Sequence, residues 1–423
     1  MQTALADFIR DTHEGREADA ILRACVHCGF CTATCPTYLL LGDEQDGPRG
    51  RIYLIKQMLE GHEVTGKTRL HLDRCLTCRS CETTCPSGVQ YGRLVDIGRH
   101  VVDQRAPRSP VARAGRWLLR ETLLSRGVFG AGVALGRLFR PVLPTRWAAK
   151  IPASRKAGVW PEAKHKRKMI ALDACVQRTL VPGIDAALAR VLDRIGISLL
   201  RVPAGGCCGA LPHHLSGEER ALEIIRRNID VWWPHVDRDV EAIVVSSSGC
   251  GVMVKDYGRM LEHQQGYRKR AKRIASLVRD PVEVIGAEWA RIAPVIALDL
   301  GAQTVAFQSP CSLQHGMQLG GRVEEILQAI GLELLPLVDP HLCCGSAGTY
   351  SLLQPKLSRE LKAAKLRNLE EGGPDVIATS NIGCLTHLAS DAKVPVRHWI
   401  ELLDERMLGG ERAPTQQDPP VLR

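Results

Sequence analysis

Cysteines in tight groups are the residues of this sequence best able to do chemistry. Two segments, Cys25 to Pro36 and Cys75 to Pro86, share the spacing C-x2-C-x2-C-x3-C-P. Three thiolates at this spacing surround one face of an iron–sulfur cube, whereas structural zinc usually takes two C-x2-C pairs or mixed Cys and His ligands. The spacing therefore predicts two [4Fe–4S] clusters and disfavours a structural zinc protein.

The fourth cysteine of each quartet follows on the next helical turn and should point away from the first three. It would then ligate the other cluster, as in two-cluster ferredoxins. The predicted ligands of cluster one are Cys25, Cys28, Cys31 and Cys85, and those of cluster two are Cys75, Cys78, Cys81 and Cys35. The quartets supply no acid, base or substrate pocket, so we predict a relay of single electrons with no catalytic residue of its own.

The other eight cysteines form an internal repeat. The first copy contains Cys175, Cys207, Cys208 and Cys250, and the second contains Cys311, Cys343, Cys344 and Cys384. Corresponding cysteines lie 136 residues apart, or 134 for the last pair. These residues form a possible additional site for a further cluster, a zinc ion or a redox-active pair; the alternative is that they are packed structural cysteines.

Each copy of the repeat alternates strand-like and helical segments. The first copy has strand-like runs at 168–174, 197–203 and 242–249 with helical segments at 183–196 and 217–236. The second has strand-like runs at 304–310, 332–337 and 375–383 with helical segments at 322–331 and 354–371. This β-α-β-α-β order predicts a parallel sheet with flanking helices, and the cysteines follow the carboxyl ends of its strands, where such sheets place their sites.

The predicted fold class is therefore a multidomain chain of mixed α+β and α/β type. A helical, ferredoxin-type domain with two clusters precedes two similar α/β repeats with short parallel sheets. The predicted division is 1–100 for the two-cluster domain, 101–165 for a basic amphipathic linker, 166–290 and 291–408 for the two repeats, and 409–423 for a flexible tail.

Positive charge is concentrated in the linker. The chain carries a formal net charge of +10, and residues 101–170 alone contribute +13. Aromatic residues make up only 4% of the chain, which argues against stacking on nucleic acid. The longest uncharged stretch, GVFGAGVALG, is too short to span a membrane. The linker could instead lie on anionic lipid or pack as an ordinary helical connection.

The clustered cysteines and the charged N-terminus, which has no signal-like apolar run, indicate a reducing, cytoplasmic location. The linker adds the prediction of a peripheral position on the inner face of the cell membrane. We find no Gly-rich phosphate loop followed by a helix, so any flavin must come from another chain.

Several further residues invite a functional interpretation. Arg49 and Arg51 could lie near a cluster and raise its potential, or could simply belong to a turn and a helix start. Histidines near the repeat cysteines could bind metal or move protons, although most histidines do neither. These histidines are His213, His214, His315 and His387, of which His315 follows a cysteine most closely.

Long segments of the sequence resemble the iron–sulfur subunit of bacterial glycolate oxidase. They include ILRACVHCGFCTATCPTY, GPRGRIYLIKQMLEGHEV, HLDRCLTCRSCETTCPSGV, HLCCGSAGTYSL and VRHWIEL. The resemblance implies a complex in which an FAD-binding subunit oxidises glycolate to glyoxylate. Electrons would then pass through two clusters of this chain to a membrane quinone or another acceptor. Relatives with this layout serve lactate utilisation, anaerobic glycerol-3-phosphate dehydrogenase and heterodisulfide reductase, which leaves a thiol or disulfide enzyme as an alternative.

The repeats resemble the CCG cysteine-rich domains of the same superfamily. Members that bind a non-cubane cluster use five cysteines per repeat, ending in C-x-x-C. Ser247 and Asn381 stand where the first cysteine of that final pair would be. A five-thiolate cluster is therefore not expected in either repeat.

Overall fold

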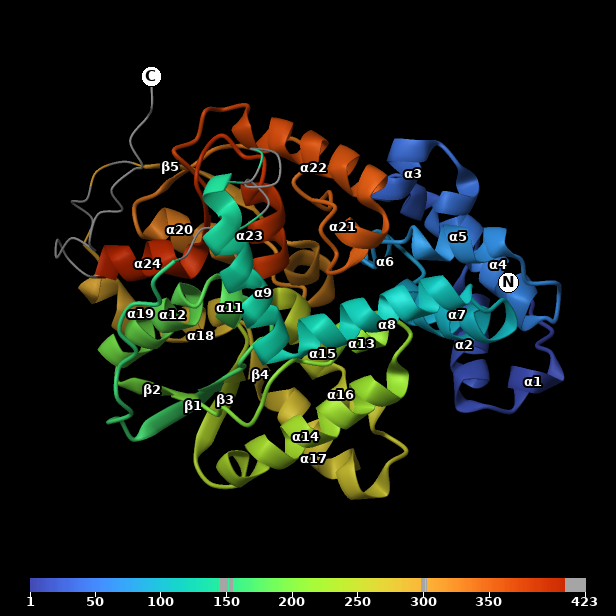
Figure 1. Ribbon diagram of the computed structural model, residues 1–423, viewed down its shortest axis with the longest axis horizontal. Helices are drawn as coiled ribbons and strands as arrows, with labels where there is room; N and C mark the ends of the chain where they lie inside the picture. The colour runs from blue at the N-terminus through green and yellow to red at the C-terminus, as the bar shows by residue number, and fades with distance from the viewer. Residues whose placement is uncertain (143, 145–150, 152–154, 298–300, 302, 408–423) are drawn as a thin grey trace.

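The computed structural model describes residues 1–142, 144, 151, 155–297, 301 and 303–407. In Figure 1 the N-terminal helices, in blue, lie at one side of the molecule. The first repeat (green to yellow) and the second (orange to red) lie on the other side, and helices α8 and α9 run across the front. The predicted tail at 409–423 and part of the predicted linker lie outside the described residues.

The N-terminal region is helical, as predicted. Thr12 caps one helix through Gly15 N, and prolines stand at the first positions of two others, where a missing N–H costs nothing. Leu22, Ile55 and Leu94 are fully buried and form the core. The elements are α1 Asp7–Arg10, α2 His13–Ala24, η1 Phe30–Thr32, α3 Pro36–Leu41, η2 Glu44–Asp46, α4 Pro48–Leu59, α5 Gly66–Asp73, α6 Ser80–Thr83 and α7 Tyr91–Arg105.

Two helices with no buried residue connect this region to the repeats: α8 Pro110–Leu124 and α9 Arg126–Phe139, followed by the short η3 Arg140–Val142. Both helices are tied to neighbouring elements through arginines. Arg116 pairs with Asp73, and Arg126 pairs with Asp173 and donates to Pro203 O at 2.9 Å. None of the helices in the described part of the chain is long and apolar enough to cross a membrane.

The first repeat is a parallel sheet of order β2-β1-β3-β4 with flanking helices. The predicted strands and helices are confirmed, and the fourth strand was not predicted. The elements are β1 Arg167–Ala171, α11 Gln177–Leu180, α12 Gly183–Arg194, β2 Ile197–Arg201, α13 Ala210–His214, α14 Glu218–Val236, β3 Val240–Val244, α15 Ser248–Lys255, α16 Tyr257–Met260, α17 Gln265–Leu277, β4 Val278–Arg279, α18 Pro281–Ala287, α19 Trp289–Ile292 and η4 Ala293–Val295.

The second repeat has the matching order β6-β5-β7-β8, also parallel. The run predicted at 332–337 forms a strand only over Glu333–Leu334, since Pro336 has no N–H to donate to a ladder. The elements are β5 Thr304–Gln308, η5 Ser312–Gly316, α20 Arg322–Ala329, β6 Glu333–Leu334, α21 Tyr350–Leu353, α22 Pro355–Glu370, β7 Val376–Thr379, α23 Ile382–Ala389, β8 Val396–His398 and α24 Trp399–Met407.

The two repeats pack face to face around one shared apolar core, which includes Leu188, Val305 and Trp399. Buried Asp404 on α24 accepts hydrogen bonds from Arg190 and Arg194 on α12. This packing brings the carboxyl ends of both sheets toward the same region. The domain boundaries given above stay a prediction from the sequence.

Candidate functional site

The two quartet loops adopt the same backbone conformation. Positive φ angles occur at His27 (58°) and Gly29 (88°) in the first loop and at Thr77 (53°) and Arg79 (62°) in the second. These pairs are each 50 residues apart, like the quartets themselves. A left-handed residue between successive cysteines turns the chain back, so that three thiols can face one centre.

The first thiol set joins the two loops. Burial raises the pKa of the Cys31 thiol to about 11, and repulsion from Cys25, Cys28 and Cys85 adds to this rise. Cys85, from the second loop, therefore lies among three thiols of the first. Four thiolates that repel one another need a positive group at their centre, so this donor set fits an iron–sulfur cluster.

The second thiol set is the reciprocal one. Burial raises the pKa of Cys81 well above its ordinary value, and Cys78, Cys75 and Cys35 add to the rise. Cys35 is the member contributed by the first loop. The structure thus brings together both sets of four thiols that the sequence predicts. That these thiols bind clusters stays a prediction.

Arginines lie beside both sets. Burial alone would raise the pKa of the Cys75 thiol, but the guanidinium groups of Arg51 and Arg99 hold it below its usual value. Arg51 is itself buried and forms an ion pair with buried Asp46 at 3.4 Å. Arg49 lies over the first loop, where a Cβ on Gly29 would come within 2.8 Å of its Nη1. The predicted proximity of these arginines to the quartets is therefore observed.

The repeat cysteines also converge, four in each repeat. In the first repeat the thiols of Cys175, Cys207 and Cys208 hydrogen-bond in series, and Cys208 contacts Cys250. In the second, Cys311 Sγ lies 3.9 Å from Cys343 Sγ, and the series continues through Cys344 to Cys384. Each group is again a set of four soft donors, suited to zinc or to an iron–sulfur cluster.

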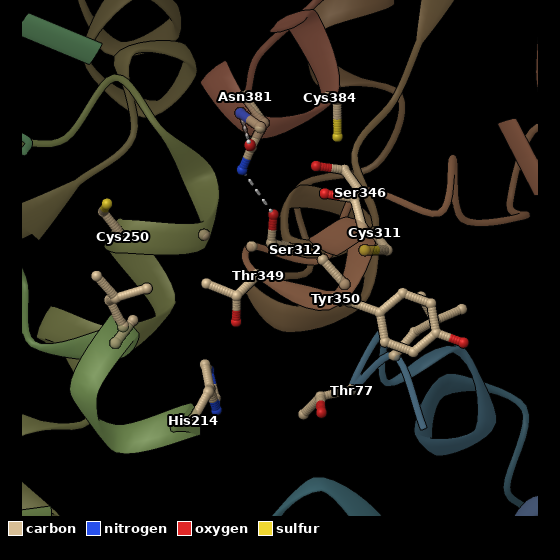
Figure 2. Close-up of a pocket in the computed structure, with 18 of the residues that line it drawn as sticks. Thr77, His214, Cys250, Cys311, Ser312, Ser346, Thr349, Tyr350, Asn381 and Cys384 are labelled. Carbon is tan, nitrogen blue, oxygen red and sulfur yellow. Dashed lines mark hydrogen bonds between the residues drawn. The ribbon is translucent and has the colours of Figure 1, made fainter. Parts of the chain in front are cut away.

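Polar side chains occupy the positions of the missing fifth cysteines. Asn381 donates a hydrogen bond from its amide nitrogen to Ser312 Oγ at 3.3 Å and accepts one from Gly383 N (Figure 2). Ser247 is buried at the matching position of the first repeat. Neither residue offers a thiolate, so the structure agrees with four sulfur donors per repeat.

The second repeat adjoins the second quartet set. Leu76 and Cys78 pack with Cys343 and Tyr350 in one apolar cluster. Tyr350 donates to Arg74 O at 3.1 Å, and Thr83 Oγ1 hydrogen-bonds to His315 Nδ1 at 2.9 Å. This docking could not be predicted from the sequence, because its partners lie more than two hundred residues apart.

All eight repeat cysteines line one cavity of about 1820 Å³, together with Cys75 and Cys78 (Figure 2). The four predicted histidines lie on its wall, and α9 contributes Val128 and Phe129. The His214 side chain is accessible from the cavity, but protein surrounds it on the other sides. This burial lowers the pKa of its imidazole to about 4. The cavity combines thiols, imidazoles and apolar side chains, and it connects the repeats with the second quartet set.

Comparisons with known proteins agree with this arrangement. A model of a 4Fe-4S dicluster domain matches residues 21–89, and a model of a cysteine-rich domain matches residues 170–255 and 305–389. The glycolate oxidase iron-sulfur subunit of Escherichia coli K12 is 51% identical over 96% of this chain and 99% of its own. The probable glycolate oxidase iron-sulfur subunit of Bacillus subtilis 168 is 27% identical over 94% and 96%. Lactate utilization protein A of an Exiguobacterium strain is 23% identical, covering 55% of this chain.

Proposed function

The chain belongs to the family of glycolate oxidase iron–sulfur subunits, and on that basis we propose how it carries electrons. It is an electron-transfer subunit of an oxidoreductase complex, and its partner is a flavin subunit. Two [4Fe–4S] clusters would be held by the crossed thiol sets, with Cys85 completing cluster one and Cys35 completing cluster two. The observation that carries this proposal is the mixing of thiols from both loops in each set.

A [4Fe–4S] cluster, when bound, takes up and releases one electron at a time. The residues around the second set stabilise added negative charge. Tyr91 donates its hydroxyl to Cys75 Sγ at 3.6 Å, and Thr77 N donates to the same sulfur at 3.4 Å. With the buried cation Arg51, these groups would favour the reduced state of a cluster held there and raise its potential. The second set would then be a suitable destination for electrons from the first.

We further propose that the second repeat holds an additional iron–sulfur cluster on Cys311, Cys343, Cys344 and Cys384. Support comes from the contact of this set with Cys78 of the second quartet set. A cluster at this place would extend the electron relay to the cavity. The first repeat makes no such contact within the described residues. Zinc would suit four thiolates equally well as a donor set, but it cannot carry electrons.

The proposed third cluster can be tested by metal analysis of cysteine variants. Replacing Cys343 and Cys344 by alanine should remove about four iron and four sulfide atoms per chain, while the quartet clusters remain. The matched variant, Cys207 and Cys208 to alanine, should lose no iron. Both variants are analysed for iron, zinc and acid-labile sulfide after anaerobic purification. If the variant at Cys343 and Cys344 loses zinc and no iron, the second repeat holds a zinc site and not a cluster.

The acceptor is proposed to be a membrane quinone, reached from the inner face of the cell membrane. Helices α8 and α9 expose apolar side chains, among them Trp117, Leu118, Leu138 and Phe139, together with exposed Arg113 and Arg140. A helix pair of this kind binds weakly at an anionic interface.

We predict salt-sensitive binding of the chain to vesicles that contain anionic phospholipid. Flotation should recover the protein at low salt and lose it at high salt, because screening weakens the arginine contacts. Replacing both Leu138 and Phe139 by aspartate should abolish flotation, whereas Val338→Asp, on an exposed site of the second repeat, should not. If the unchanged chain, the double variant at Leu138 and Phe139, and Val338→Asp all float equally, α8 and α9 do not form the membrane-binding surface.

The proposed function is tested with this chain alone and with this chain combined with its flavin subunit and glycolate. The purified chain should not oxidise glycolate, because we assign that step to the flavin subunit. The flavin subunit with glycolate should reduce the clusters of this chain, observed as bleaching of their visible absorbance. Glycolate oxidation by this chain alone, or no bleaching by the pair, would overturn the assignment.

A further inference from the structure

The loop of the first quartet lies at the molecular surface. Of the sixteen cysteines, all of which the structure describes, Cys28 is the one that is exposed. Large side chains on the same loop or in contact with it are also exposed: Val26 is 67% exposed, Phe30 is 61% exposed, and Tyr53, whose ring meets that of His27, is 48% exposed. His27 packs edge-on against Tyr53, with ring centroids 6.5 Å apart. We call Val26, His27, Phe30 and Tyr53 the electron-entry face.

The other thiol sets have no comparable surface. Cys75 and Cys81 are buried, and Cys78 opens onto the internal cavity. A small acceptor can enter a cavity, but another protein can approach only a set that reaches the outer surface. The first set is therefore the place where a protein donor can come near a cluster, and the cavity is the place where a small acceptor can.

Charged groups of both signs lie around the electron-entry face. Arg49, Lys56 and the amino group of Met1 are close to His27, but Arg49 is paired with Glu44 at 2.6 Å and Lys56 with Glu60 at 2.6 Å. An apolar centre with a charged rim is the usual composition of a protein–protein interface. The complementary partner surface would be apolar at its centre and charged at its rim.

We propose that the flavin subunit docks on the electron-entry face and delivers its electrons there. This inference rests on the proposed function and adds the site of delivery. Oxidation of one glycolate to glyoxylate releases two electrons and two protons. The protons leave through the partner and solvent, and the electrons enter this chain singly at the set that contains Cys28.

The test uses the full chain, its flavin subunit and glycolate. Phe30→Asp and Tyr53→Asp each place an unpaired negative charge in the apolar centre, where the docked partner would remove it from water. Each should lower the rate of cluster reduction by the flavin subunit at least about tenfold, and co-purification of the two subunits should be lost. Reduction of the same variants by dithionite should be unchanged, which shows that the clusters are intact. Val338→Asp is the matched control and should behave as wild type.

The outcomes separate this inference from the proposed function. If wild-type clusters are not reduced by the flavin subunit and glycolate, the proposed function itself fails. If wild type is reduced, and Phe30→Asp and Tyr53→Asp are reduced equally fast, the docking site is wrong. Tyr53 lies on α4, outside the cysteine loop. Tyr53→Asp therefore still tests the docking site even if Phe30→Asp disturbs cluster one.

Discussion

Replacing Cys35 by alanine should remove cluster two and leave cluster one, although Cys35 belongs to the first quartet. The reason is its position: the Cys35 thiol lies with Cys75, Cys78 and Cys81 rather than with its sequence neighbours. The variant should keep about four of eight quartet iron atoms. Electrons from glycolate should still reach cluster one but go no further, so acceptor reduction should cease.

The reciprocal variant, Cys85→Ala, should lose cluster one and retain cluster two. EPR of the two dithionite-reduced proteins should therefore show one cluster each, with different spectra. Thr34→Ala is a suitable control, since Thr34 adjoins Cys35 and makes one hydrogen bond, to Thr84 at 3.2 Å. If Cys35→Ala instead removed the cluster bound by Cys25, Cys28 and Cys31, the crossed ligand sets would be wrong.

Replacing Asp46 by alanine should destabilise the N-terminal region by about 3–5 kcal/mol. Asp46 is fully buried and binds Arg74 Nη1 at 2.7 Å, His71 Nδ1 at 3.0 Å and Arg51 Nη2 at 3.4 Å. Its removal leaves the Arg51 charge buried, with 1% of the residue exposed and no carboxylate beside it. The denaturant midpoint, followed by circular dichroism under anaerobic conditions, should fall accordingly.

Two variants control for this effect. Asp7→Ala breaks an exposed ion pair with Arg10 and should leave the midpoint unchanged. A double variant, Asp46→Leu with Arg51→Met, removes both buried charges and should be more stable than Asp46→Ala alone. A double variant no more stable than the single one would show that the ion pair is not the source of the effect. Arg51→Met alone should lower the potential of cluster two, because it removes a cation beside Cys75 and leaves the Asp46 carboxylate in place.

Much of this arrangement follows from spacing along the chain. The C-x2-C-x2-C-x3-C-P pattern requires three thiols to face one centre, and so predicts that Cys35 and Cys85 point elsewhere. Strand and helix periodicity predicts both repeats, and the cysteines after each strand predict thiols at one sheet edge. These signals are local or repeat at a fixed interval, which is why sequence reasoning can find them.

The contacts that distinguish the two repeats could not be predicted in this way. Tyr350 meets Arg74, and His315 meets Thr83, across separations that leave no periodic signal. The strands β4 and β8 contain two and three residues, too few for a recognisable pattern. Likewise, the amphipathic character of α9 was visible in the sequence, but its place in the cavity wall depends on tertiary packing.

The most direct test is the iron, acid-labile sulfide and zinc content of the full chain after anaerobic purification, with EPR of the reduced protein. We expect about twelve iron and twelve sulfide atoms with negligible zinc: eight of each on the quartets and four of each in the second repeat. EPR should show two neighbouring [4Fe–4S] clusters in the quartet region. Zinc in place of iron, or at most about four iron atoms per chain, would contradict the two-cluster relay on which the proposed function depends.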